Sequence, residues 1–422
     1  MQPLPEPELR AAAAGDFASV AFSSHGDATL DGAAAWIRLS ICVLTAAVGG
    51  VAFWSVVVVL PEVQAEFGSA RGEASLAYSA NMIGFALGGI FMGRLADRRG
   101  IAVPVAIGGV ALGAGYALAA LAPSLWSFVL IHGALIGFLG GSASFGPLVA
   151  DVSHWFRRRR GIAMAICASG NYVAGAVWPP LIRYAVDLHG WRAAHFMIAA
   201  ICVAAILPLA WMLRHPAPHE AEATAGDSGR DLAAISPNRL QAILALAGVS
   251  CCIAMAMPQV HIVAYCADLG FELARGAEML SLMLAAGVAS RLISGWISDR
   301  IGGVRTLLLG ALLQTTTLAL YIPFDGLASL YLVSFLFGLS QGGIVPSYAL
   351  IVRESMPARE AGARVGTVLM ASIVGMALGG WMSGLVFDVA GSYRAAFLNG
   401  IAWNLVTVAT AVWLVRRLPR PA

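Results

Sequence analysis

The stretch G93-R-L-A-D-R-R-G100 occurs twice in this sequence. Its second copy, G295-W-I-S-D-R-I-G302, begins 202 positions later and keeps both glycines and the Asp-Arg pair. The pair Gly140-Gly141 recurs at the same offset as Gly342-Gly343, and G190-W-R-A-A-H-F196 is echoed by G391-S-Y-R-A-A-F397. Three repeats at nearly one spacing predict a chain built from two similar halves.

The composition indicates what those halves are made of. The chain has 422 residues, of which 59% are hydrophobic and 12% are charged, and its mean hydropathy is +0.79. A soluble domain carries about 25% charged residues, roughly twice this share. Apolar runs of about 20 residues, long enough to cross a ~30 Å hydrocarbon core, recur along the chain. We therefore predict an all-α polytopic membrane protein.

Hydropathy divides the chain into twelve predicted spans, six on each side of a polar segment. The spans are 35–60, 74–94, 101–121, 125–150, 161–186, 191–213, 239–265, 276–298, 303–322, 326–351, 361–387 and 393–415. Two six-helix bundles in the same orientation imply a pseudo-two-fold axis along the membrane normal. The predicted units are a disordered cytoplasmic tail (1–33), an N-terminal bundle (34–213), a cytoplasmic linker (214–238), a C-terminal bundle (239–415) and a second cytoplasmic tail (416–422).

Arginine placement predicts the orientation. With a cytoplasmic N-terminus, the Arg157–Arg160 run and most other arginines fall in cytoplasmic segments. The outer loops then keep only Arg71, Arg183, Arg192, Arg275 and Arg394. The positive-inside rule puts both termini in the cytoplasm of a bacterial inner membrane. Four arginines at a helix end are ordinary topology signals, so no nucleic-acid partner is predicted.

Motifs for catalysis and cofactors are not found in the sequence. It has no G-x-x-x-x-G-K loop, no H-E-x-x-H and no Ser/His/Asp cluster. Its cysteines lack the spacing of metal ligands. We expect no enzyme, no cofactor and no metal, and a protein whose transport is driven by gradients rather than by ATP.

Arg291 is the main candidate site residue. It lies in the apolar stretch L282-M-L-A-A-G-V-A-S-R-L-I-S-G-W296, eight residues before Asp299. That places it ~12 Å from the predicted cytoplasmic end, where a charge costs about 2.5–3.5 kcal/mol. No Asp or Glu lies near the middle of any span, and Glu278 is roughly 20 Å away along the helix. We expect Arg291 to bind a substrate anion; the alternative is a snorkelling or structural arginine.

Other polar side chains within the spans could hydrogen-bond the same substrate. The further substrate-binding candidates are Asn81, Asn171, His261, Gln341, Tyr348 and Trp54. His261, one turn after Pro258, and His132 are also candidates for carrying a proton. Each of these groups could instead be a structural hydrogen-bonding residue between helices.

Charged residues recur at the predicted cytoplasmic ends of spans 2, 4, 8 and 10. The gating candidates are Asp97, Arg98, Asp151, Asp299, Arg300 and Glu354. Such charges can form an inner latch that breaks when the bundles rock. Solvated charges that only set topology would explain the arginines but not the repeated aspartates.

A known family shares these motifs. G93-R-L-A-D-R-R-G100 and its copy resemble the loop signature of the major facilitator superfamily. W155-F-R-R-R-R-G-I-A-M-A-I-C-A-S-G170 resembles the monocarboxylate transporter signature. F53-W54 and P61-E-V-Q-A-E-F-G68 are similar to bacterial relatives of those carriers and of oxalate:formate exchangers. The resemblance implies that Arg291 binds a carboxylate and that Asp97 contacts the start of span 11.

The sequence departs from that family at two points. The acid that animal monocarboxylate carriers have in span 1 is missing from A46-A-V-G-G-V-A52, and their acid one turn before the span 8 arginine is Gly287 here. The oxalate-type exchangers imply a second cation in span 11, where A363–D388 offers only Arg364.

We predict a secondary transporter of a small organic anion, with a monocarboxylate and proton symport as the leading hypothesis. One central cation favours a singly charged substrate. The alternatives are an anion exchanger of the oxalate:formate type and a proton-driven exporter of drugs or metabolites, which would prefer a mid-membrane acid. The predicted partners are the substrate, a proton or counter-anion and the lipid bilayer, with a functional monomer.

Overall fold

The computed structural model describes residues 30–215, 235–356 and 358–417. Residues 1–29, 216–234 and 418–422, which hold most of the predicted tails and linker, lie outside the described residues. Every regular element in the described part of the chain is a helix. The all-α prediction is confirmed.

The N-terminal half consists of helices that precede residue 216. They are α2 (Ala33–Gly49), α3 (Val51–Val58), α4 (Leu60–Phe67), α5 (Arg71–Arg99), α6 (Ala102–Ala120), α7 (Leu125–Ile131), the π-helix η1 (His132–Gly140), the 3-10 helix η2 (Gly141–Ser144), α8 (Gly146–Trp155) and α9 (Arg160–Met212).

The C-terminal half follows residue 234. Its helices are α10 (Pro237–Asp268), α11 (Leu273–Ile301), α12 (Gly303–Leu320), α13 (Leu327–Gln341), α14 (Ile344–Ser355), α15 (Ala358–Ala390) and α16 (Tyr393–Arg417).

Glycines with positive φ separate consecutive spans at the repeated motifs. Eleven helices of the described residues are long and apolar enough to cross a membrane. One of them, α9, contains Gly190 at φ 79° and ψ 162°, outside the helical region, so α9 is two spans and the count becomes twelve. Gly100 and Gly302 end α5 and α11 with nearly equal φ of 78° and 82°. The repeated sequence motif is therefore also a repeated backbone conformation, of a kind that glycine adopts without strain.

Glycines also let spans approach closely inside each half. A methyl group at Gly88 in α5 would lie 2.0 Å from the Phe138 carbonyl oxygen of η1. In the second half, a methyl group at Gly338 in α13 would lie 2.1 Å from the Met283 carbonyl oxygen of α11. Small residues bring helix backbones into contact in membranes, where packing rather than water drives association. Spans 2 and 4 thus pair as spans 8 and 10 do.

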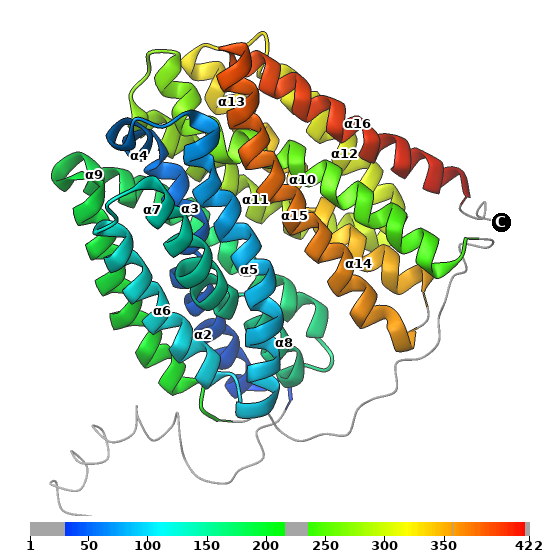
Figure 1. Ribbon diagram of the computed structural model, residues 1–422. Coiled ribbons are helices and arrows are strands. Elements are labelled where there is room, and N and C mark those ends of the chain that lie inside the picture. The colour runs from blue at the N-terminus through cyan, green and yellow to red at the C-terminus, as the bar shows by residue number, and fades with distance from the viewer. Residues whose placement is uncertain (1–29, 216–234, 357, 418–422) are drawn as a thin grey trace, which may run out of the picture.

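Two pairs of helices make most of the contacts between the halves, along a seam: α5 packs against α15, and α9 packs against α11. We call the end of the seam with Arg71, Asp268 and Asp388 the Arg71 side, and the end with Asp97 and Asp299 the motif side. Figure 1 shows α5 and α15 side by side near the Arg71 side and diverging toward the motif side, where α8 and α14 lie.

Candidate functional site at the bundle seam

Arg291 reaches from α11 across the seam to α9. Its Nη1 donates to the Ala168 carbonyl oxygen at 3.2 Å, and its guanidinium carbon lies 4.6 Å from the centre of the Tyr172 ring. The Nε–H is buried and has no hydrogen-bond partner. No ion pair joins Arg291 to a carboxylate among the described residues. The guanidinium contacts a neutral carbonyl and a ring, so its charge is not neutralised.

The backbone around Arg291 is fixed by small residues. A methyl group at Gly342 would lie 2.5 Å from the Arg291 backbone nitrogen. The Ser290 hydroxyl donates to the Leu339 carbonyl at 2.5 Å and accepts the Gly342 N–H at 3.1 Å. The turn after α13 therefore lies directly against α11 and holds Arg291 at the seam.

Gly287 explains how one departure from the family pattern is accommodated. The resemblance implies an acid at this position, one turn before Arg291. Here a methyl group would lie 2.6 Å from the Tyr172 ring. The aromatic ring from the other bundle occupies the space beside Gly287 and also lies under the guanidinium. A ring face attracts a cation but, unlike a carboxylate, does not neutralise its charge.

Trp54 of α3 contacts α9 at Asn171, on the helix face that Arg291 also contacts. Trp54 Nε1 donates to the Asn171 carbonyl at 3.3 Å, and the Asn171 side-chain oxygen is buried without a partner. Ala168, Asn171 and Tyr172 are three and four residues apart and so share one helix face. The structure thus brings Arg291, Asn171 and Trp54 together around about one turn of α9.

Asn81, Gln341 and Tyr348 lie within single bundles. Each is fully buried. The Asn81 amide donates to the Ala52 carbonyl at 2.8 Å, Gln341 accepts from Gln259 at 2.5 Å, and the Tyr348 hydroxyl donates to the Cys251 sulfur at 3.3 Å. These are contacts between helices of one half. A substrate-binding role for these side chains stays a prediction.

The two candidate proton carriers lie in different surroundings. His132 is buried in the N-terminal half, where its Nδ1 lies 3.0 Å from the Phe128 carbonyl and its ring centre 6.1 Å from that of His195. His261 is also buried, but its Nδ1 lies 3.1 Å from the Tyr393 hydroxyl and its Nε2 lies 2.8 Å from the Gly380 carbonyl. Only His261 is connected to a cluster that joins the two bundles.

That cluster holds the Arg71 side together, and the sequence reasoning missed it. Arg71 forms an ion pair with Asp268, donates to the Tyr393 hydroxyl at 3.1 Å and lies 4.3 Å from the Phe387 ring centre. The Asp388 carboxylate accepts the backbone N–H of Arg71 at 2.9 Å and that of Gly72 at 2.7 Å. An acid of α15 therefore caps the N-terminus of α5, where the helix dipole favours negative charge.

Further contacts make the Arg71 side tight. The Ser79 hydroxyl donates to the Ala377 carbonyl at 2.6 Å. A methyl group at Gly384 would lie 2.9 Å from the Cα atom of Gly72. The Ser281 hydroxyl donates to the Ala176 carbonyl in the α9–α11 pair. The only sequence signal for this end was that acids and arginines lie at predicted span ends.

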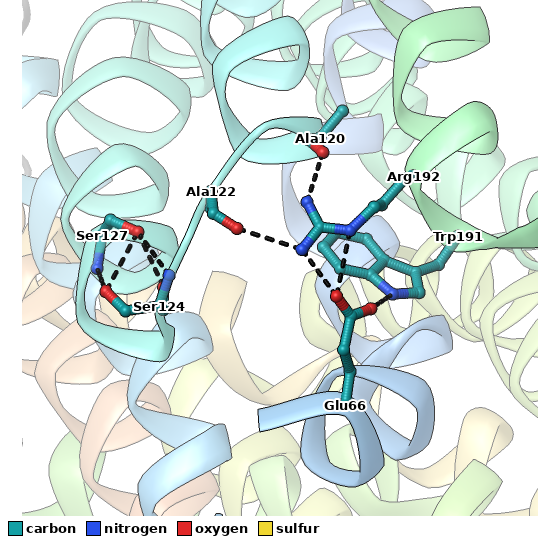
Figure 2. Close-up of polar contacts among 7 residues, drawn as sticks. All are labelled: Glu66, Ala120, Ala122, Ser124, Ser127, Trp191 and Arg192. Carbon is teal, nitrogen blue, oxygen red and sulfur yellow. Dashed lines mark hydrogen bonds and ion pairs between the residues drawn. The ribbon is translucent and has the colours of Figure 1, made fainter. Parts of the chain in front are cut away.

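A polar cluster within the N-terminal half links the ends of its spans on the same side (Figure 2). The Glu66 carboxylate accepts from Arg192 at 2.6 and 3.0 Å and from the Trp191 ring nitrogen at 2.6 Å. Arg192 also donates to the Ala120 and Ala122 carbonyls. The hydrogen bond from Arg192 is the largest cause of a lowered Glu66 pKa. Ends of three spans are tied by these two residues.

Among the described residues, the motif side makes no such contacts between the bundles. Asp97, Arg98 and Asp299 are exposed and form no hydrogen bond or ion pair with any described residue. Arg300 lies over the Trp296 ring of its own helix. A methyl group added at Gly93 would meet nothing within 4 Å.

The remaining gating candidates bind within their own halves. Asp151 takes two hydrogen bonds from Arg38, at 2.8 and 2.9 Å, and Glu354 accepts the Gly303 N–H at 3.3 Å. In this conformation none of the six gating candidates forms a hydrogen bond or ion pair with a described residue of the other half. A latch that forms in another conformation stays a prediction.

Comparison with known proteins identifies the family. The model of the Major Facilitator Superfamily matches residues 42–366 and 279–422. The chain belongs to this superfamily. The expectation from the two loop motifs is confirmed, and the protein is a multi-pass membrane transporter of this group.

Several curated relatives share most of the chain. Monocarboxylate transporter 11 of Mus musculus is 30% identical over 77% of this chain and 75% of its own. Monocarboxylate transporter 13 of Bos taurus is 28% identical over 71% of this chain and 70% of its own. The uncharacterized MFS-type transporter YcxA of Bacillus subtilis is 28% identical over 78% of this chain and 82% of its own.

Solved structures share the fold at low identity. A bacterial homologue of the human lysosomal transporter Spinster, in an inward-facing and occupied conformation, has a TM-score of 0.62 at 15% identity and covers 91% of this chain and 95% of its own. A mutant of the peptide transporter POT in complex with sulfate has a TM-score of 0.70 at 13% identity and covers 90% and 95%. These likenesses show the fold alone.

Proposed function

We propose that this protein is a secondary transporter of a small monocarboxylate, which binds through its carboxylate to Arg291. The observation that carries the proposal is a guanidinium at the seam, without a resident acid among the described residues and with a buried Nε–H that has no partner. A charge held in a membrane protein without a fixed counter-ion is costly. A substrate anion that arrives and leaves would supply the counter-charge.

The N–H groups of Arg291 that have no described partner match the geometry of a carboxylate. Nη1 is used by the Ala168 carbonyl, whereas Nε and Nη2 bond no described residue. These two nitrogens form the side edge of the guanidinium, which can donate two parallel hydrogen bonds to one carboxylate. Trp54 and Tyr172 supply aromatic surface nearby for the apolar part of the acid. The names of the monocarboxylate relatives support the same substrate class.

The seam supports transport by alternating access. Polar contacts close its Arg71 side, and the described charges of its motif side are free of cross-bundle contacts. Arg291 lies between these ends. With the arginine-rich motif side in the cytoplasm, as the positive-inside rule favours, this conformation is open to the inside. Rocking of the bundles would close the motif side through Asp97 and Asp299 and open the Arg71 side.

Uptake into proteoliposomes tests this function. The substrates are radiolabelled formate, lactate, pyruvate, a branched-chain keto acid and an aromatic acid, each with and without an inward proton gradient. We expect a monocarboxylate to be taken up and the proton gradient to accelerate it. Uptake that ignores the proton gradient but needs a preloaded anion would instead indicate exchange.

An arginine pair provides the matched control. Arg291→Lys should lose most uptake, because a point-charge ammonium cannot reproduce the bidentate fork. Arg305→Lys, an exposed residue at the start of α12, should keep it. Equal uptake by the two variants would contradict the proposed role of Arg291.

A further inference from the structure

His261 lies directly beneath the contacts that close the Arg71 side. Its Nε2 faces the Gly380 carbonyl of α15 at 2.8 Å, and its Nδ1 faces the Tyr393 hydroxyl of α16 at 3.1 Å. The same hydroxyl accepts from Arg71 of α5 at 3.1 Å. A continuous chain of hydrogen bonds therefore runs from the buried imidazole to the ion pair between the bundles.

The hydrogens along this chain can all be placed with a neutral imidazole. A carbonyl only accepts, so Nε2 carries a hydrogen. The Tyr393 oxygen accepts from Arg71, and its own hydrogen is available for Nδ1. Every group is then satisfied with His261 neutral.

A second proton on the ring disrupts this arrangement. Nδ1 would become a donor, and the Tyr393 hydrogen would lose its acceptor. A second cation would also stand one side chain away from Arg71, which would repel it. The closed seam therefore fits the neutral ring and opposes the protonated one.

The surrounding charged and titratable groups come from each helix at this end. They are Arg71 and Tyr78 of α5, Asp388 of α15, Tyr393 of α16, and Tyr265 and Asp268 of α10 itself. Both acids already interact with the N-terminal end of α5. Asp268 forms an ion pair with the Arg71 side chain, and Asp388 caps the backbone N–H groups of the helix. Neither acid is hydrogen-bonded to the imidazole to compensate a charge on it.

We propose that His261 is the proton-binding site of the transport cycle, and that binding a proton at Nδ1 opens the Arg71 side. A proton taken from the outer solution would weaken the bonds from Tyr393 and Arg71 and separate α5 from α15. Closing the same side requires His261 to be neutral again. For the proton to cross the membrane, it must pass from His261 toward the motif side as the Arg71 side closes. This inference rests on the proposed alternating-access function.

Distance measurements between spin labels test the proposal without any substrate. Labels at Ala65→Cys and Ala328→Cys, both exposed on the Arg71 side in different bundles, report its opening. The native cysteines among the described residues are buried. In nanodiscs we expect a short distance at about pH 8 and a growing long-distance population toward about pH 5, the range in which histidine usually titrates.

His261→Gln separates the effect of protonation from the effect of losing the hydrogen bonds of residue 261. Glutamine can donate to Gly380 and accept from Tyr393, so the closed seam keeps its bonds but cannot be charged. The long-distance population at low pH should be lost. His132→Gln is the matched control, because His132 is equally buried but lies in the N-terminal half with its Nδ1 on the Phe128 carbonyl. This variant should keep the pH response.

A full pH response in His261→Gln would overturn the proposal. If the response were then lost in Asp388→Asn, proton sensing would be assigned to the acid. Because no substrate is present, failure of Arg291 to bind an acid would leave this result unaffected, and the two proposals can fail separately.

Discussion

The two ends of the seam contain the same kinds of residue in opposite states. On the Arg71 side, Arg71 and the N-terminus of α5 are held by Asp268 and Asp388 of the other bundle. On the motif side, Asp97 and Asp299 stand in solvent, without bonds to any described residue. An acid near a helix end therefore does not join the bundles by itself. Asp268 and Asp388 do so because they lie at the end where the bundles meet.

This difference indicates how contacts at the two ends of the seam could set the equilibrium between two conformations. Interactions at one end favour one tilt of the bundles, and interactions at the other end would favour the reverse. Arg291 lies between the two ends of the seam, beside Ala168 and Tyr172 of α9. A substrate bound there would be exposed to one side or the other as the balance shifts. Changes at each end should therefore have opposite or unequal effects.

Of the changes that distinguish the two ends of the seam, removal of Arg71 should reduce uptake most. Arg71→Ala deletes an ion pair and a hydrogen bond to Tyr393, and loss of one partner of a partly buried pair costs about 2–5 kcal/mol. We expect uptake to fall by at least about tenfold, the factor for about 1.4 kcal/mol, because the Arg71 side no longer closes.

Arg275→Ala is the control for Arg71→Ala. Arg275 lies on the same side, but its ion pair joins it to Glu278 on its own helix, and both side chains are more than two-fifths exposed. Exposed pairs of this kind contribute little. A comparable loss of uptake in both variants would mean that general surface charge, and not closure of the seam, matters at this end.

Crowding the backbone of Arg291 should have the next largest effect. A methyl group in Gly342→Ala meets the Arg291 nitrogen at 2.5 Å, and overpacking costs about 1–3 kcal/mol. We expect a lower melting temperature and weaker substrate binding. Gly89→Ala has nothing within 4 Å and should hold or raise the melting temperature, since alanine favours helix over glycine. Equal melting temperatures in the two variants would contradict this packing.

On the motif side, loss of charge should affect the transport rate more than the stability of the fold. Asp97→Asn removes no bond present in this conformation, so its melting temperature should stay close to that of the wild type. If Asp97 forms the latch of the other conformation, uptake should slow severalfold while equilibrium binding of substrate changes little. Parallel uptake and binding assays measure both. Equal losses would argue that Asp97 contacts the substrate or supports the fold.

The smallest expected effect lies away from the seam, at Glu66. Its pKa is lowered mainly by the hydrogen bond from Arg192, so the pair stabilises the fold above the ordinary glutamate pKa. This contribution is lost as the pH falls through the lowered pKa. For a partly exposed pair it should be about 0.2–1 kcal/mol. A double-mutant cycle of Glu66→Gln and Arg192→Gln, followed by thermal unfolding at neutral and acidic pH, should show coupling only at neutral pH.

The repeated glycine motifs carried most of the fold information. Gly100, Gly190 and Gly302 could be recognised in the sequence because positive φ restricts the residue type, and the structure places each at a helix break. The charge at Arg291 was equally visible, since an arginine in an apolar run has few explanations. Both signals are local, which is why sequence reasoning could find them.

The contacts of these residues were not visible, because they depend on how distant helices pack. Nothing near Arg71 in sequence indicates Asp268 or Asp388, which are brought to it by the packing of the two bundles. The Tyr172 ring beneath Arg291 likewise depends on the space beside Gly287. Asp31 is a further example: it lies in the range predicted as a tail, yet its carboxylate accepts the backbone N–H groups of the arginines at 157, 158 and 159.

Equilibrium binding to Arg291→Ala tests the central claim most directly. The ligand is the monocarboxylate with the highest uptake in the panel, compared with its primary amide, and thermal unfolding verifies that the variant is folded. We predict that the wild type binds the acid and ignores the amide. Arg291→Ala should bind the acid at least about 30-fold more weakly, the factor for the loss of about 2 kcal/mol from a desolvated charge pair. A folded Arg291→Ala variant that binds the acid with near wild-type affinity would contradict the account.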